Sequence, residues 1–410
     1  MADRGRPQAS APSRIEFIAL MAMMVAVIAF SLDAMLPALP QIAASLSPDA
    51  PDRVQLLVPS FVLGLGLGTL TVGPMADRFG RKPVLLVLVA VYCAGAALAW
   101  RAQSLDLLLA ARVLQGLGAA GPRVVAMTVV RDRYVGREMA QIMSFIMMVF
   151  ALVPAIAPAL GAALIALAGW RSVFVSFAVF ALTSGLWFML RQPETLAPAD
   201  RLPLDMRRLA RAAKEILSHR VMQRSILVQI LIYGMLFGNL STVQPVMDQI
   251  FHRGDSFPLW FALIALFGSA GGFINSRLVM RLGMRRMIVR ALICQFVVSL
   301  AYLACDFVGL GTGALGFAAF FVWTMSVFLL VGFTLGNLNA LALEPLGHLA
   351  GTATSVMTAI ATVGAAVIAV PVSLAFDGTS PHPVALVLLC YVTPAMLLMR
   401  GMPREAPRPT

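Results

Sequence analysis

Two charged side chains inside apolar stretches, Asp33 and Arg112, are the residues of this sequence best suited to do chemistry. Asp33 lies seven residues before Pro40, and Arg112 lies seven residues after Leu105. At a rise of about 1.5 Å per helical residue, each side chain is about 10 Å from the outer end of its own helix. A carboxyl group near a guanidinium can take up and release a proton as its access to water changes. The spacing therefore predicts an acid and a base at matching depth inside an apolar layer.

Arg123 is a third charge within an apolar stretch. It follows Arg112 by eleven residues, which is about three helical turns, so both side chains project from one face. An arginine inside a membrane span costs at least about 2.5–3.5 kcal/mol on insertion scales, so it needs protein or water around it. Two interpretations of Arg123 stay open: it lines the inner half of a cavity, or it extends toward the inner membrane interface.

The elements that must position these residues are membrane-spanning helices. Of the 410 residues 60% are apolar and 12% are charged, and the mean hydropathy is +0.87. Soluble domains are about 45–50% apolar and about 25% charged, so the composition excludes an ordinary water-soluble protein. Apolar runs of bilayer length recur along the chain. They predict twelve spans, near residues 17–39, 54–75, 83–100, 105–130, 139–168, 171–190, 221–248, 257–280, 286–305, 311–340, 350–376 and 383–400.

The positions of lysine and arginine predict how the spans are oriented. The net charge is +12, but nearly all basic residues fall between apolar runs, which argues against nucleic-acid binding. They concentrate in loops that share one side with the N-terminus, which predicts that both termini are cytoplasmic. The predicted organisation is a cytoplasmic tail over 1–16, a six-helix bundle over 17–190, a linker over 191–220, a second bundle over 221–400 and a cytoplasmic tail over 401–410.

The second part of the linker carries apolar residues at near-helical spacing with basic residues between them. One interpretation is an amphipathic helix that lies on the anionic inner leaflet. The other is a solvated charged linker. Both stay open.

A short segment between the second and third predicted spans reads Gly73-Pro-Met-Ala-Asp77-Arg78-Phe-Gly80-Arg81-Lys82. Glycine allows close helix approach at a short turn, and an acid beside bases can lock the turn through charge-assisted bonds. The segment resembles the G-x-L-A-D-R-x-G-R-K pattern of the major facilitator superfamily, with Met75 in place of leucine. The resemblance implies that Asp77, Arg78 and Arg81 act as a latch between cytoplasmic helix ends in the outward-facing state.

A partial internal repeat agrees with this resemblance. The segment Met280-Arg-Leu-Gly283-Met-Arg285 aligns with the segment from Asp77 to Lys82. The implied fold is an all-α membrane protein with twelve transmembrane helices in two six-helix bundles. Two such bundles, with a binding site near the bilayer midplane between them, form a transporter plan.

The fourth predicted span contains a second signature of the superfamily, R-x-x-Q-G-x-G-A-A, without change. Its first positions are Arg112, Gln115 and Gly116. The context of Asp33 resembles the drug/proton antiporter branch, in which an aspartate of the first span carries the proton. The resemblance implies that Asp33 and Arg112 belong to the proton-coupling machinery.

The fifth predicted span is similar to the antiporter motif G-x-x-x-G-P-x-x-G-G, with alanine at several glycine positions. Its prolines bend the helix and its small residues allow close packing; the motif positions are Pro154, Pro158 and Gly161. This weaker form resembles the bicyclomycin and chloramphenicol resistance (Bcr/CflA) subfamily.

Polar residues recur at helical spacing in two spans of the second half. They are Gln229, Tyr233, Phe237 and Gln244 in the seventh span, and Ser355 and Thr358, with Thr362, in the eleventh. One interpretation is that these stripes line a substrate cavity. The other is that they form interhelical hydrogen bonds within the lipid-embedded bundle.

The expected function is export of small, mainly apolar or neutral compounds in exchange for protons, across a bacterial inner membrane. An importer or facilitator of a nutrient on the same fold is the alternative, and a membrane sensor or enzyme without transport is a remote one. The four histidines are isolated, the four cysteines stand singly, and there is no phosphate-binding glycine loop. We therefore expect no catalytic residues, metal or cofactor. The partners expected are the substrate, protons and lipid, and the resemblance implies a monomer.

Overall fold

The computed structural model describes residues 12–201, 206–307, 311 and 313–402. Within these residues, twelve helical segments are long and apolar enough to cross a membrane, as predicted. The elements are α1 (Arg14–Asp33), η1 (Leu36–Ala38), α2 (Leu39–Leu46), η2 (Pro51–Leu56), α3 (Leu57–Phe79), α4 (Arg81–Arg101), α5 (Leu105–Arg133), α6 (Gly136–Ala168), α7 (Arg171–Arg191), η3 (Pro198–Asp200), α8 (Met206–Ser218), α9 (Arg220–Gln249), α10 (Phe257–Leu282), α11 (Met284–Phe307), α12 (Gly313–Leu343), η4 (Glu344–Leu349), α13 (Ala350–Ser373) and α14 (His382–Arg400).

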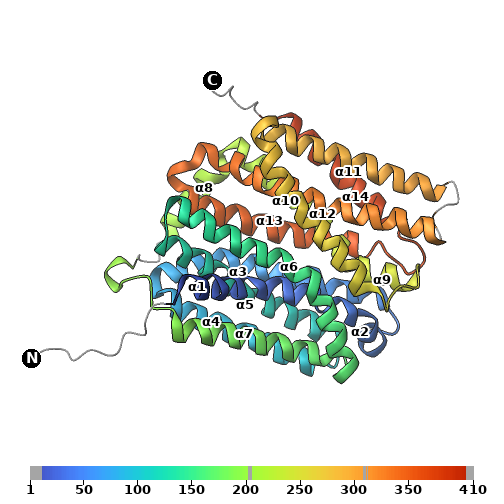
Figure 1. Cartoon of the computed structure of the whole chain (residues 1–410), viewed down its shortest axis with the longest axis horizontal. Helices are drawn as coiled ribbons and strands as arrows, with labels where there is room; N and C mark the ends of the chain where they lie inside the picture. Colours follow the sequence, from blue (N-terminus) through green and yellow to red (C-terminus); the bar gives the residue numbers. More distant parts are fainter. Residues whose placement is uncertain (1–11, 202–205, 308–310, 312, 403–410) are drawn as a thin grey trace, which may run out of the picture.

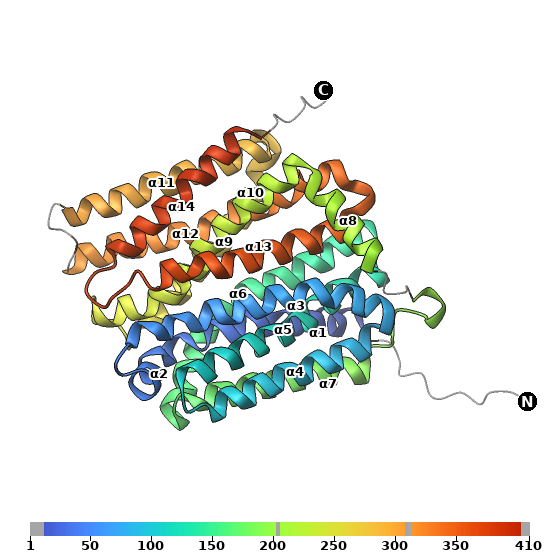
Figure 2. The same cartoon turned by 180° about the vertical axis from the view of Figure 1, so that it is seen from behind.

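The spans form two side-by-side groups, seen in Figures 1 and 2 as a blue-to-green group and a yellow-to-red group. In the N-terminal bundle, α1 to α7, α5 packs against α3 and α4, α4 packs against α7, and α1 packs against α6. In the C-terminal bundle, α9 to α14, α9 packs against α13, and α12 packs against α10 and α11. The two bundles meet where α3 lies against α13 and α6 lies against α10.

The molecule has two distinct ends. We call the end at which α1 begins the basic end, and α8 lies there too (Figures 1 and 2). At this end Arg14 donates a hydrogen bond to Gln141 over 2.7 Å, and Arg191 pairs with Glu16 over 2.6 Å. At the opposite end, which we call the far end, Gln55 donates a hydrogen bond to the Phe376 carbonyl over 3.3 Å, which links the two bundles.

The first span is longer than predicted and is interrupted. It runs from Arg14 to Leu46, where the sequence predicted 17–39. The α-helix stops at Asp33, a 3-10 turn follows over Leu36–Ala38, and α2 resumes the span. Prolines 37 and 40 supply no N–H group, so the α-helical hydrogen-bond ladder cannot pass through them. The tighter turn lets the chain continue in the same direction.

The linker contains a helix, α8, and two of its apolar side chains pack on the protein. In α8, Ile216 is fully buried in a small cluster with residues of α9, η4 and α13, and Leu217 packs against the same cluster. These two side chains therefore pack against the C-terminal bundle at the basic end and do not contact a lipid leaflet. The predicted tails fall largely outside the described residues.

Matching turns relate the two bundles. α3 ends at Gly80 with φ 98°, and α10 ends at Gly283 with φ 83°. Each glycine N–H donates to the carbonyl four residues earlier, and the positive φ is one that other residues rarely adopt. The weak sequence repeat thus corresponds to the same helix-ending turn in both bundles.

Glycines bring α5 into backbone contact with α3. A methyl group at Gly116 would overlap the carbonyl oxygen of Phe61, and one at Gly64 would overlap the carbonyl oxygen of Val113. By contrast, a methyl group at Gly336 in α12 would have no neighbour within 4 Å. The small residues at the first two positions let the helices approach closely.

We expect Gly116→Ala to lower the thermal stability of the purified protein, because α3 and α5 would have to separate to admit the methyl group. Overpacking of this kind costs about 1–3 kcal/mol. Gly336→Ala is the matched control and should leave stability unchanged or slightly raised. Equal melting temperatures for Gly116→Ala and the unaltered protein would show that the contact tolerates separation.

Candidate functional site

Asp33 lies at the interruption of the first span. It is the last residue of α1 and only 4% exposed. Within the described part of the chain, its carboxyl group has no hydrogen-bond or ion-pair partner. It is also the only acid there that lies deep in a span, since the other span acids lie within three residues of a span end. The chain thus keeps one unpaired carboxyl group inside the N-terminal bundle.

The fifth-span motif supports this interruption. A methyl group at Gly161 of α6 would overlap the carbonyl oxygen of Ala34, the residue that follows Asp33. α6 therefore touches the backbone where α1 ends. Pro158 and Pro154 lie within α6, about one and about two turns before this contact, respectively. Both are positioned to shape α6 as it approaches the interruption.

Arg112 is fully buried among three helices of its own bundle. Its Nη2 donates to the Ser31 carbonyl of α1 over 3.0 Å, and its Nη1 donates to Gln115 over 2.6 Å. The guanidinium also lies over the Phe61 ring of α3, 4.4 Å from the centroid. Its Nε has no hydrogen-bond partner. A carbonyl, an amide and a ring face together replace part of the hydration that the cation loses.

Arg112 of α5 contacts α1 close to Asp33, but the two side chains are not paired. No ion pair within 4.0 Å joins their side chains in the described structure, and Arg112 instead holds the backbone two residues before Asp33. The depths estimated from the sequence agree with this contact. The rotation of each helix, which the sequence does not give, directs the guanidinium to the Ser31 carbonyl.

Two residues of this region were not predicted. The Tyr92 hydroxyl of α4 shares a hydrogen bond with the Ser31 hydroxyl, and both side chains are buried. Ser31 therefore links α1 to α4 through its side chain and to α5 through its carbonyl. Neither residue belongs to a recognisable motif, and only the packed bundle brings them together.

The predicted latch forms a compact network at the basic end. Arg81, only 6% exposed, pairs with Asp77 over 2.6 Å and with Asp132 of α5 over 3.2 Å. The Glu194 carboxylate accepts hydrogen bonds from the backbone N–H groups of Arg81 and Lys82, both over 3.0 Å. All these contacts lie within the N-terminal bundle and the segment that follows α7.

The remaining latch positions contribute less. Arg78 is exposed, and its guanidinium lies 5.6 Å from the ring centroid of its neighbour Phe79. Gly80 provides the left-handed turn, and a methyl group there would crowd the Glu194 carboxylate. Gly73 has open space around its Cα, so no close helix contact accounts for it.

Cations cap the ends of the outer helices. Lys82, at the start of α4, donates to the Met189 carbonyl near the end of α7 over 2.8 Å. Arg171, at the start of α7, donates to the Trp100 and Ala102 carbonyls at the end of α4, over 3.1 and 3.0 Å. Arg285 does the same for α14, donating to the Met399 and Arg400 carbonyls. These charges satisfy carbonyls that have no partner within their helix.

The stripe predicted on the seventh span lies on α9. Gln229, 2% exposed, donates to Asn339 of α12 over 2.6 Å. Tyr233 and Phe237 stack on each other, with ring centroids 5.7 Å apart and planes 16° from parallel. Gln244 is buried and its Oε1 has no partner. The stripe therefore contains an interhelical hydrogen bond at Gln229 and a buried amide oxygen without a partner at Gln244.

Asn239, also on α9, was not predicted and has no hydrogen bond at either amide atom although it is fully buried. In α13, Ser355 donates to the Gly351 carbonyl over 3.2 Å, and Thr362 donates to the Thr358 carbonyl over 2.7 Å. The α13 hydroxyls of Ser355 and Thr362 are thus bonded to their own helix.

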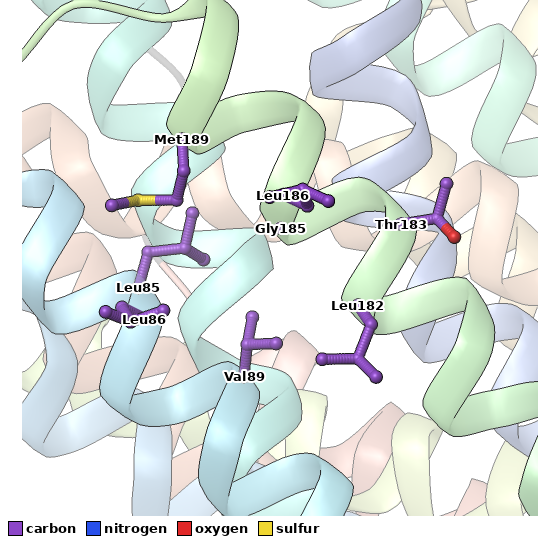
Figure 3. A pocket seen from close by; sticks show the side chains of 8 residues that line it. All are labelled: Leu85, Leu86, Val89, Leu182, Thr183, Gly185, Leu186 and Met189. Carbon is purple, nitrogen blue, oxygen red and sulfur yellow. The ribbon is translucent and has the colours of Figure 1, made fainter.

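A groove of about 380 Å³ lies between α4 and α7, and Figure 3 shows its lining. The lining residues are Leu85, Leu86, Val89, Leu182, Thr183, Gly185, Leu186 and Met189. The Thr183 hydroxyl is bonded to the Val179 carbonyl. None of these lining residues is charged, so the groove is distinct from the buried charges Asp33 and Arg112. Among the described residues, no cluster of His, Cys, Asp and Glu could hold a metal.

Comparison with known proteins identifies relatives along most of the chain. The family model for the Major Facilitator Superfamily matches residues 21–369. A bicyclomycin resistance protein homolog of Haemophilus influenzae is 28% identical over 355 residues, covering 86% of this chain and 87% of the relative. The multidrug resistance protein MdtL of Salmonella heidelberg is 29% identical over 227 residues, covering 55% of this chain and 56% of the relative.

Among solved structures, the D-xylose-proton symporter superposes with a TM-score of 0.74 at 14% identity, covering 95% of this chain and 98% of that one. At this identity the likeness concerns the fold alone. The relatives and the structural neighbour are transporters and not enzymes. With twelve spans and bacterial relatives, the chain is a multi-pass protein of the inner membrane.

We expect Arg81→Ala to speed amide hydrogen exchange at the junction of α3 and α4, because Asp77 and Asp132 would lose their shared cation. A charge-assisted hydrogen bond contributes about 1.5–3 kcal/mol, so exchange should rise by about tenfold or more. Arg78→Ala is the control, because it removes an exposed cation that forms no ion pair with any described residue. Identical exchange in both variants would mean that the network does not hold the junction.

Proposed function

Because the chain belongs to the Major Facilitator Superfamily, we propose that it exports small molecules in exchange for inward-moving protons. The observation that carries this proposal is the carboxyl group of Asp33, which has no partner among the described residues and is buried where the first span is interrupted. The printed names of relatives, which concern bicyclomycin and multidrug resistance, support export of drug-like compounds. The expected substrates are small and mainly apolar or neutral.

Proton exchange follows from the cost of burying a charge. An ionised carboxylate enclosed without a hydrogen-bond partner is strongly disfavoured, whereas the protonated form is neutral. When one side of the site closes around Asp33, a bound proton lowers the cost of closure. When the other side opens, water stabilises the carboxylate and the proton leaves. Substrate and proton then use opposite halves of one conformational cycle.

Arg112 acts on this cycle through α1. It holds the Ser31 carbonyl, so a shift of α1 near Asp33 must also move or break this bond. Because a guanidinium stays protonated in proteins, the buried Arg112 contributes a lasting positive charge to this part of the bundle. Asp33 and Arg112 together form the proposed coupling site. The Asp77–Arg81 network is the proposed latch, which favours the outward-facing state.

The orientation in the membrane follows the positive-inside rule. The basic end, which holds the latch and α8, is the proposed cytoplasmic end, so both termini are cytoplasmic. The far end, where Gln55 meets Phe376, then faces the periplasm. The protein functions as a monomer with two six-helix bundles over 17–190 and 221–400, joined by the linker 191–220.

The proposal is tested first in cells. A pump-deficient bacterial host that expresses the protein is exposed to a panel of antimicrobial compounds, with and without an uncoupler. Exported compounds are those whose toxicity falls only while the proton gradient is intact. Accumulation of compounds driven by the gradient would instead indicate a proton-coupled importer.

We expect Asp33→Asn to abolish proton-driven export, because the amide is neutral in both states and cannot carry the proton. Flux of an exported compound is measured in proteoliposomes with an imposed pH gradient, and equilibrium binding of the same compound is expected to persist. Asp106→Asn is the matched control, since Asp106 forms an exposed ion pair with Arg53 at the far end. Undiminished export by Asp33→Asn would refute the role of this residue.

A further inference from the structure

The groove between α4 and α7 lies on the outer side of the N-terminal bundle. The close contacts of α4 and α7 are with each other and with α1, α3, α5 and α6. Figures 1 and 2 place the pair along the edge of the molecule that points away from the C-terminal bundle. Three lining leucines, Leu86, Leu182 and Leu186, are each more than half exposed. In a membrane this groove therefore opens toward lipid and not toward the contact between the bundles.

The groove lies within one leaflet. α4 and α7 each have 21 residues, so each is about 31 Å long, which matches the hydrocarbon thickness of about 30 Å. Leu85 and Val89 follow the first residue of α4 by four and eight residues, and Met189 and Leu182 precede the last residue of α7 by two and nine. The lining therefore runs from about 3 to about 14 Å into the hydrocarbon layer from the basic end.

A cation lies at the mouth of the groove. Lys82, the second residue of α4, donates a hydrogen bond over 2.8 Å to the carbonyl of Met189, whose side chain lines the groove. An ammonium group has three N–H donors. Within the described part of the chain, that of Lys82 has no other hydrogen bond and no ion pair, and the side chain is partly accessible. Because α4 only just spans the hydrocarbon layer, this charge lies at the level of the lipid headgroups.

The acid beside Lys82 is already satisfied. The Glu194 carboxylate accepts hydrogen bonds from four backbone N–H groups, those of Arg81, Lys82, Thr195 and Leu196. It caps the start of α4 and forms no ion pair with the Lys82 ammonium. The cation at the mouth is thus left to interact with an anion from outside the protein.

The lining favours a hydrocarbon chain over a polar compound. Figure 3 shows side chains of α4 and α7 facing each other across the groove, and Thr183 supplies the one hydroxyl among them. That hydroxyl is bonded to the Val179 carbonyl of its own helix. Sites for drug-sized compounds place several polar groups for orientation, and their volumes are about 300–1,000 Å³. A groove of about 380 Å³ without a free polar group suits part of an acyl chain.

We propose that the groove between α4 and α7 binds one anionic phospholipid from the leaflet at the basic end. One acyl chain lies along the leucines of the groove, and a phosphate oxygen accepts a hydrogen bond from the Lys82 ammonium. Lysine binds phosphate as a point charge, and a basic residue near the membrane surface attracts anionic lipid. This inference depends on the membrane location of the chain and not on the proposed export.

The first test measures lipid affinity by native mass spectrometry of the full-length protein, released from detergent micelles. The probes are phosphatidylglycerol and phosphatidylcholine with identical acyl chains, and each titration gives the Kd of the first bound lipid. We expect phosphatidylglycerol to bind about fivefold more tightly, because it is anionic and phosphatidylcholine is zwitterionic.

Lys82→Gln is expected to raise the Kd for phosphatidylglycerol about fivefold and that for phosphatidylcholine less, whereas Lys82→Arg keeps the charge and the preference. Arg286→Gln is the matched control, since it removes an exposed cation near the start of α11 and should change neither Kd by more than about twofold. Thermal melting of each variant reports whether it is folded.

A second variant tests the groove without touching the cation. Thr183→Trp places an indole ring in the groove at an exposed position and should abolish the tight binding of phosphatidylglycerol. Val297→Trp is its control, because Val297 of α11 is also exposed and lies outside the groove. If Lys82→Gln loosens the end of α7, Thr183→Trp still decides whether the groove holds the lipid.

Photolabelling then locates the lipid. Phosphatidylglycerol with a diazirine in one acyl chain is incorporated into nanodiscs that contain the protein, and the labelled peptides are identified after irradiation. We expect label within residues 85–89 and 182–189, and less label there in Thr183→Trp.

Equal affinities for the two lipids, equal losses in Lys82→Gln and Arg286→Gln, or label spread evenly over the spans would each overturn the site, because ordinary lipid contact would then explain the binding. Unchanged binding to Thr183→Trp would overturn it as well. These measurements need neither a substrate nor a proton gradient, so they stand apart from the test of export.

Discussion

The enclosure of the Arg112 guanidinium is the constraint on which the N-terminal bundle depends. A buried cation must recover in the protein much of the stabilisation it loses in leaving water. Here it does so through the Ser31 carbonyl, Gln115 and the Phe61 ring. These groups come from α1, α5 and α3, so the bundle can satisfy the charge only when the three helices are correctly placed. The glycine contacts between α3 and α5 allow this closeness.

The same constraint explains why the proposed coupling site contains both a satisfied and an unsatisfied charge. Arg112 is bonded on two nitrogen atoms, whereas the Asp33 carboxyl group is not bonded within the described structure. A stable arginine gives the site a fixed geometry. In the proposed cycle, an aspartate without partners is free to change its protonation state. Had the two formed a tight ion pair, the proton would have had to compete with that pair in every cycle.

Much of the fold could be predicted from the sequence, because a lipid environment requires long apolar helices and places basic residues at one end. The twelve spans and the helix-ending turns at Gly80 and Gly283 illustrate this. The contacts of Ser31, Tyr92 and Phe61 could not be predicted, because they depend on how each helix is rotated about its axis. The rise per residue gave the depth of Arg112 but not its partner. The extension of the first span from the predicted end at residue 39 to Leu46 could not be predicted either, because a 3-10 turn carries the span past its prolines.

The exchange of cations between α4 and α7 has a mechanical consequence. Lys82 binds a carbonyl near the end of α7, and Arg171 binds carbonyls at the end of α4. The antiparallel pair is therefore linked by hydrogen bonds at both of its ends. Neither helix can slide or pivot on its own without breaking a charged cap. We therefore expect α4 and α7 to keep their relative position. Changes in helix position are then expected in the helices at the contact between the two bundles. In any rotation of one bundle relative to the other, α4 and α7 would then move together as a rigid body.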